Sequence, residues 1–163
     1  MFSSTSSGRF GFNIQRLLVA VDGSDNARRA TNAAVDLAVK YEAELIVLHV
    51  MPRLTYEFIP VSLSAPAIPP TGFGRLYEEA KKAAMKYVEE AATRAQNRGV
   101  DAKGEVLENA PSIVQAITDY ASQEKVDLIV VGTKGLSGFK KLLIGSVSSG
   151  VVSHANQPVL LTR

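Results

Sequence analysis

The chain has 163 residues, with 18 basic and 16 acidic side chains, no cysteine and 46% hydrophobic residues. A chain of this length forms one domain and buries enough apolar surface to fold without disulfides or metal ions. The absence of cysteine excludes disulfide frameworks, thiolate metal sites and cysteine nucleophiles, and a net charge of +2 argues against bulk nucleic-acid binding.

The first residues differ in composition from the rest of the chain. Residues 1–13 are rich in serine and predict a flexible segment, followed by a single domain at 14–163. This start lacks the apolar core of a signal peptide, and the apolar runs elsewhere are far shorter than the roughly 20 residues that span a bilayer. We therefore expect a soluble, cytoplasmic protein that does not contact membranes.

Short apolar runs alternate with helical patterns up to residue 50. Residues 16–21 consist of an arginine and a continuous apolar run, which is typical of a strand buried on both faces. A helical repeat of alanines follows, with Ser24 or Asp25 available as its N-cap. Residues 44–50 predict a second buried strand.

Residues 51–75 interrupt this rhythm with five prolines and two glycines. Proline removes a backbone donor and glycine weakens regular structure, so we expect an inserted surface loop over the whole range.

The second half resumes the alternation. The predicted elements are a helix from 76 to about 98, a polar strand near an edge at 100–107, a helix with Pro111 at its first position, a buried strand at 126–131, a helix at 146–155 and a strand at 158–162. Strands that alternate with helices predict a parallel sheet covered on both faces, which is the α/β class.

Glycines and serines follow the fourth strand. Gly132 and Gly135 come directly after it, and Gly145 and Ser146 open the next helix. Glycines let backbone N–H groups turn toward an anion, and a helix start favours phosphate. The last 35 residues contain four basic residues and no acidic one, so no carboxylate repels an anion there. These features together predict a polyphosphate site.

The first strand offers the complementary half of such a site. Asp22, Gly23 and Ser24 follow its carboxyl end, where open α/β sheets bind ligands at a switch point. A carboxylate at Asp22 can accept from a ribose hydroxyl or an adenine amino group. One adenine nucleotide would span the distance between the two strand ends.

These residues resemble the universal stress protein family. Gly132, two residues, Gly135, nine residues and then Gly145-Ser146 match the glycine motif of its nucleotide-binding members. The resemblance extends from about residue 14 to residue 162 and includes Asp22-Gly23-Ser24 after the first strand.

The resemblance implies a Rossmann-like, three-layer α/β/α sandwich of the adenine nucleotide alpha hydrolase type, with a five-stranded parallel sheet of order 3-2-1-4-5. It implies ATP at the switch point, in a homodimeric, nucleotide-dependent stress-response switch. Carried over by position, the nucleotide-binding residues would be Asp22 and the Val50 backbone at adenine, Ala20 and Val21 in its pocket, Val131, Gly132 and Gly135 at ribose and phosphates, and Gly145, Ser146, Val147 and Ser148 at the triphosphate. Lys134 is a further candidate beside the phosphates.

The resemblance also implies that two copies pair through the last strand, at Val159, Leu160, Leu161 and Thr162. Two departures from the family pattern stand out. Asn109 occupies a position where glycine is frequent, and Asn tolerates the left-handed backbone. The 51–75 segment is longer than in compact members, which leaves open what covers the nucleotide.

Two other function classes remain open. One is a slow ATPase or nucleotide-transfer enzyme that uses Asp22 to orient a nucleophile, although the sequence contains no Walker or kinase signature and no catalytic set at usable spacing. The other is a nucleotide-free interaction module, which a damaged glycine motif would indicate. No residue cluster predicts a resident metal; magnesium would arrive with ATP through its phosphates. His49 is interpreted as a hydrogen-bonded strand residue, and no downstream partner can be named.

Overall fold

The computed structural model describes residues 13–53, 70–133 and 144–163. Its elements are β1 Arg16–Ala20, α1 Asp25–Tyr41, β2 Glu44–Pro52, α2 Pro70–Gln96, β3 Ala102–Ala110, α3 Ile113–Gln123, β4 Leu128–Gly132, α4 Ser146–His154 and β5 Val159–Thr162. All strand pairs are parallel and the sheet order is β3-β2-β1-β4-β5, which confirms the predicted topology.

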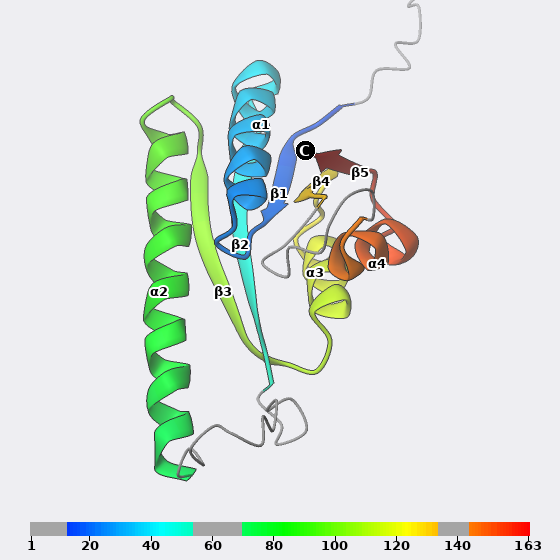
Figure 1. The fold of residues 1–163 in the computed structure, drawn as a ribbon. Helices are drawn as coiled ribbons and strands as arrows, with labels where there is room; N and C mark the ends of the chain where they lie inside the picture. The colour runs from blue at the N-terminus through cyan, green and yellow to red at the C-terminus, as the bar shows by residue number, and fades with distance from the viewer. Residues whose placement is uncertain (1–12, 54–69, 134–143) are drawn as a thin grey trace, which may run out of the picture.

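Helices cover both faces of the sheet (Figure 1). Because side chains alternate along a strand, Leu17 and Val19 join the core under α1 and α2, whereas Leu18 joins the core with α3 and α4. β1 and β4 are buried along nearly their whole length, as the continuous apolar runs predicted. β3 is an edge strand, also as predicted.

The predicted loop is wrong at both of its ends. β2 continues through Pro52, and α2 already begins at Pro70. Proline is compatible with these two places, because a strand end and the first helical position need no backbone donor. Residues 54–69 lie outside the described residues.

Two N-caps show how the first and third helices begin. Ser24 accepts a bond from the Ala27 N–H at 3.1 Å and caps α1. Ser112 accepts from the Gln115 N–H at 3.3 Å and caps α3. Pro111 therefore precedes the cap, and its expected place at the first helical position is wrong. A serine cap supplies the acceptor that the helix start needs.

Asn109 adopts a left-handed backbone with a φ of 55°, which explains why Asn can stand where glycine is frequent in the family. The Asn109 N–H donates to the hydroxyl of Tyr77 in α2 at 3.3 Å. At the other end of β3, the Gln96 amide donates to the Ala102 carbonyl at 2.7 Å. Both ends of this edge strand are thus tied to α2.

α2 packs very closely on β3 at Gly104. A Cβ on Gly104 would lie 2.9 Å from the backbone of Val88, which is closer than carbon atoms approach without displacement. A glycine here lets the helix backbone lie directly on the edge strand.

The substitution Gly104→Ala is expected to destabilise the fold by about 1–3 kcal/mol, because the new methyl group meets helix backbone that cannot rotate away. Gly74→Ala is the matched control. Gly74 lies in α2, and apart from its own turn of helix no described atom lies within 4 Å of its added Cβ, so alanine there is expected to stabilise by about 0.5–1 kcal/mol. Urea unfolding of the two variants measures both values; a Gly104→Ala protein as stable as the parent would contradict the close packing.

Candidate functional site

A cavity of about 200 Å³ opens at the carboxyl ends of β1 and β4. From β1 the chain turns to α1 on one face of the sheet, and from β4 it goes on to α4 on the other, so the two connections diverge. This divergence is the switch point at which α/β sheets bind ligands. The lining residues are Ala20, Val21, Asp22, Ala27, Leu48, His49, Val50, Ile113, Ile117, Val131, Gly132, Gly145, Ser146, Val147 and Ser148.

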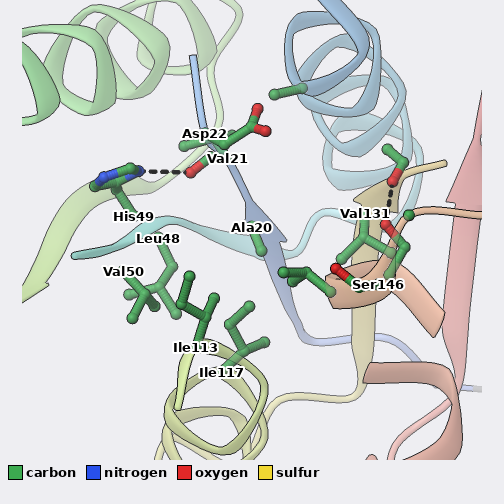
Figure 2. A pocket seen from close by; sticks show the side chains of 15 residues that line it. Ala20, Val21, Asp22, Leu48, His49, Val50, Ile113, Ile117, Val131 and Ser146 are labelled. Carbon is green, nitrogen blue, oxygen red and sulfur yellow. Dashed lines mark hydrogen bonds between the residues drawn. The ribbon is translucent and has the colours of Figure 1, made fainter. Parts of the chain in front are cut away.

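One part of the cavity is an apolar slot (Figure 2). Leu48 and Val50 line it from β2, and Ile113 and Ile117 face them from α3. These side chains belong to the core shared with α3 and α4. A flat, apolar ring such as a nucleobase is the kind of group that such a slot can bury.

The backbone of Val50 faces the space beyond the end of β1, because β2 is the longer strand. Along a strand, successive residues direct their N–H and C=O groups to opposite neighbours. The Leu45 N–H donates to Asp101 beside β3, whereas the Leu48 carbonyl accepts from Val21 beside β1. Val50 has the parity of Leu48, so its N–H and C=O point past the end of β1. No backbone bond from the Val50 N–H to Val21 is present in the described residues.

The start of α4 forms the opposite side of the cavity. Gly145 is its N-cap and provides no side-chain acceptor. The Gly145 N–H donates to the Thr133 carbonyl at 2.7 Å, and the first intrahelical bond comes from the Ser149 N–H. Ser146, Val147 and Ser148 lie between Gly145 and Ser149. Their N–H groups have no intrahelical acceptor, so they present the positive end of the helix dipole to the cavity.

The Ser148 side chain joins α4 to β4. Its buried hydroxyl donates to the Gly132 carbonyl at 2.6 Å. A hydroxyl has one proton, so in this arrangement the Ser148 side chain joins α4 to the end of β4, and its backbone N–H is the group left for the predicted contact with the triphosphate. Ser146 is exposed at the helix start and its side chain lines the cavity.

Gly132 brings β4 close to the start of α1. A Cβ on Gly132 would lie 3.1 Å from the backbone of Asn26. Asp22 lies in the turn after β1. Its Oδ1 accepts a bond from the Ser24 N–H at 3.0 Å, which fixes that turn. Gly132 and Asp22 both line the cavity, and both also fix the course of the backbone around it.

His49 is hydrogen-bonded, as the sequence predicted. Its Nδ1 lies 2.7 Å from the Val21 carbonyl oxygen and also contacts the Tyr87 hydroxyl of α2. Burial lowers the pKa of His49 below 6.5, against the opposing effects of the Val21 bond and the Asp22 carboxylate. Burial raises the pKa of Tyr87, with a further contribution from Asp22. Both rings are therefore neutral near pH 7.

The cavity brings together ten of the twelve predicted site residues: Ala20, Val21, Asp22, Val50, Val131, Gly132, Gly145, Ser146, Val147 and Ser148. Lys134 and Gly135 lie outside the described residues. Among the lining residues that sequence reasoning missed, Ile113 and Ile117 had a visible signal. Their spacing of four residues places them on one apolar face of α3, but which part of that face meets a cavity depends on how the helix crosses the sheet.

Neither a metal cluster nor a membrane span is found in the described part of the chain. No group of three or more His, Asp or Glu side chains there is arranged to hold a metal ion. None of the described helices combines the length and the apolar character needed to cross a bilayer.

A parallel 3-2-1-4-5 sheet with a cavity at its switch point defines a doubly wound α/β protein of the kind that binds ligands at strand ends. The model of the universal stress protein family matches residues 13–163. The chain is 37% identical over 149 residues to the universal stress protein YxiE of Bacillus subtilis, covering 91% of this chain and 98% of that protein. The chain belongs to the universal stress protein family.

Solved structures agree with this assignment. The universal stress protein UspA of Lactobacillus plantarum is 29% identical, with a TM-score of 0.77 over 93% of this chain and 99% of that one. A universal stress protein solved in complex with cAMP is 28% identical, with a TM-score of 0.67 over 93% and 98% of the two chains.

The neutral state of His49 predicts a pH dependence of stability. The folded protein holds His49 at a pKa below 6.5, so between that value and 6.5 the unfolded chain binds more protons. The His49 contribution is therefore complete above about pH 6.5 and is lost as the pH falls through the folded-state pKa. Urea unfolding between pH 7.5 and pH 5 should show a steeper loss in the parent than in His49→Asn, whose side chain does not titrate. Parallel curves for the two proteins would contradict the buried, neutral imidazole.

Proposed function

We propose that this protein binds ATP or a closely related adenine nucleotide in the switch-point cavity. The observation that carries the proposal is that one cavity combines two features. The first is an apolar slot beside Val50, whose N–H has no backbone bond to Val21 in the described residues, and the second is a helix start without a side-chain cap. The slot suits a base, and the helix start suits phosphate.

The Val50 backbone is suited to the edge of adenine. Adenine presents an amino donor next to a ring-nitrogen acceptor, and Val50 directs one N–H and one C=O into the same space. Asp22, at the rim, is suited to accept from the ribose hydroxyls. Ile113 and Ile117 would cover one face of the base.

The phosphates would lie at the start of α4. The N–H groups of Ser146, Val147 and Ser148 provide donors there, and the described chain from Leu128 to Arg163 contains no carboxylate side chain that would repel them. Gly135 and Lys134 remain predicted contacts of the phosphates. Magnesium would be held by the nucleotide and water, since the described residues contain no acidic cluster for it.

A relative supports the nucleotide class. The universal stress protein solved with cAMP shares 28% identity and nearly its whole length with this chain. Its ligand has adenine, ribose and phosphate, which are the three groups that the cavity here is proposed to recognise. ATP, with its longer phosphate chain, is the finer part of the proposal.

The nucleotide is further proposed to act in a cytoplasmic, homodimeric switch. Among the described strands, β5 pairs with β4 alone, so its other edge has no strand partner there. Leu160 on this strand is 36% exposed, and Val152 on α4 is 48% exposed. Exposed apolar side chains beside an open strand edge favour pairing with a second copy.

A charge at the start of α4 tests the proposed site. Ser146→Glu places a carboxylate where phosphate would bind, yet an acidic residue at a helix start favours the helix itself. We expect the dissociation constant of ATP, measured by titration calorimetry, to rise about 10- to 100-fold.

Ser149→Glu is the matched control. Ser149 lies on the same helix, is exposed and does not line the cavity, so the same added charge should raise the dissociation constant much less. Equal affinities for the Ser146→Glu, Ser149→Glu and parent proteins would place the phosphates elsewhere and refute the proposed site.

A further inference from the structure

The ladder between β1 and β2 ends in an unusual way. The Val21 N–H donates to the Leu48 carbonyl at 2.9 Å, so the pairing runs one residue past Ala20. In a parallel ladder the next bond would join the Val50 N–H to the Val21 carbonyl, because each residue bonds two partners that are two positions apart. The described residues contain no such bond.

The Val21 carbonyl is instead bonded by a side chain. His49 Nδ1 lies 2.7 Å from it (Figure 2). His49 has the same parity on β2 as Leu45 and Val47, whose side chains belong to the core under α1 and α2. The carbonyl is therefore held from the face opposite to the apolar slot, which Leu48 and Val50 line.

The His49 ring is itself held in place. The rings of His49 and Tyr87 meet edge to face, with centroids 5.3 Å apart and planes at 86°, and the Tyr87 hydroxyl contacts Nδ1. Tyr87 also packs on the turn after β1, because a Cβ added to Gly23 would lie 3.5 Å from its ring. Gly23 has a φ of 82°, a conformation that suits glycine. α2 thus fixes both the imidazole and the turn.

We propose that His49 is a positioning residue of the nucleotide site: it binds the Val21 carbonyl, ends the β1–β2 ladder there and leaves the Val50 N–H available to a ligand. This inference rests on the proposed function, since the Val50 backbone is the proposed partner of adenine. His49 acts through Val21 and needs no contact with the base.

The chemistry requires one particular tautomer. A carbonyl oxygen only accepts, so a bond from Nδ1 to Val21 requires the proton on Nδ1, and the Tyr87 hydroxyl, which contacts the same nitrogen, then cannot donate to it. A carbonyl has two lone pairs, so His49 does not block a second bond by saturation. The proposed role therefore requires that His49 hold the carbonyl out of line with the Val50 N–H.

Two variants separate the hydrogen bond from the packing of the ring. His49→Phe keeps a ring against Tyr87 but has no donor, and His49→Asn provides an amide donor near the place of Nδ1. In the nucleotide-free protein we expect amide hydrogen exchange at Val50 to slow at least tenfold in His49→Phe and to stay near the parent rate in His49→Asn. The amide of Leu48, inside the ladder, is the internal reference.

Nucleotide affinity gives the second measurement. The dissociation constant of AMP, measured by titration calorimetry, should rise about tenfold in His49→Phe, which is the size of one neutral hydrogen bond, and recover in His49→Asn. Imidazole nitrogen shifts in the unaltered protein should identify the Nδ1–H tautomer, and this reading does not depend on any variant folding.

The outcomes distinguish this inference from the proposed function. An Nε2–H tautomer, or unchanged Val50 exchange and AMP affinity in a folded His49→Phe protein, would overturn the role of His49. If the parent does not bind AMP while Val50 exchange slows in His49→Phe, the role of His49 in the ladder stands and the proposed function fails. If His49→Asn behaves like His49→Phe, the ring and not its proton matters, and the inference is wrong.

Discussion

The site depends on β1 ending before its neighbour β2. β1 is central and ends at Ala20, whereas β2 continues to Pro52. The backbone groups of β2 beyond that point must find partners other than β1, since buried backbone groups are rarely left unpaired. The Val21 N–H donates to the Leu48 carbonyl, and the Val21 carbonyl is bonded to the His49 side chain. The Val50 N–H therefore faces the cavity without a bond to Val21. The proposed recognition of adenine follows from this incomplete ladder.

Close backbone packing keeps the ends of β1 and β4 together around the cavity. Gly132 lets the end of β4 approach the start of α1, with only 3.1 Å between its missing Cβ and Asn26. The Ser148 hydroxyl then fastens α4 to the Gly132 carbonyl. The Ser148 bond fixes the start of α4, which is proposed to hold phosphate, and the Gly132 contact fixes the end of β4 to which Ser148 is bonded. Neither contact needs to touch the ligand. Preorganised donors bind an anion without the cost of ordering them first.

Sequence patterns predicted the sheet well, because buried parallel strands such as Leu128–Gly132 are short apolar runs that few other structures produce. The patterns were less informative where one residue type is compatible with two different local structures or contacts. Pro70 was interpreted as part of a loop but begins α2, and the bond from the Ser148 hydroxyl to the Gly132 carbonyl was not predicted. The Gly132 carbonyl that accepts from the Ser148 hydroxyl lies 16 residues away, so the local sequence does not indicate this bond. The position of Ile117 in the cavity depends on how α3 is oriented on the sheet, which the local sequence does not indicate either.

The most direct test of the account is a measurement of contacts between bound AMP and the protein by nuclear Overhauser effects. The account predicts contacts from the adenine protons to the methyl groups of Ile113 and Ile117 and to Val50, because these line the apolar slot. Adenine contacts confined to α1 and α2, on the opposite face of the sheet, would contradict it.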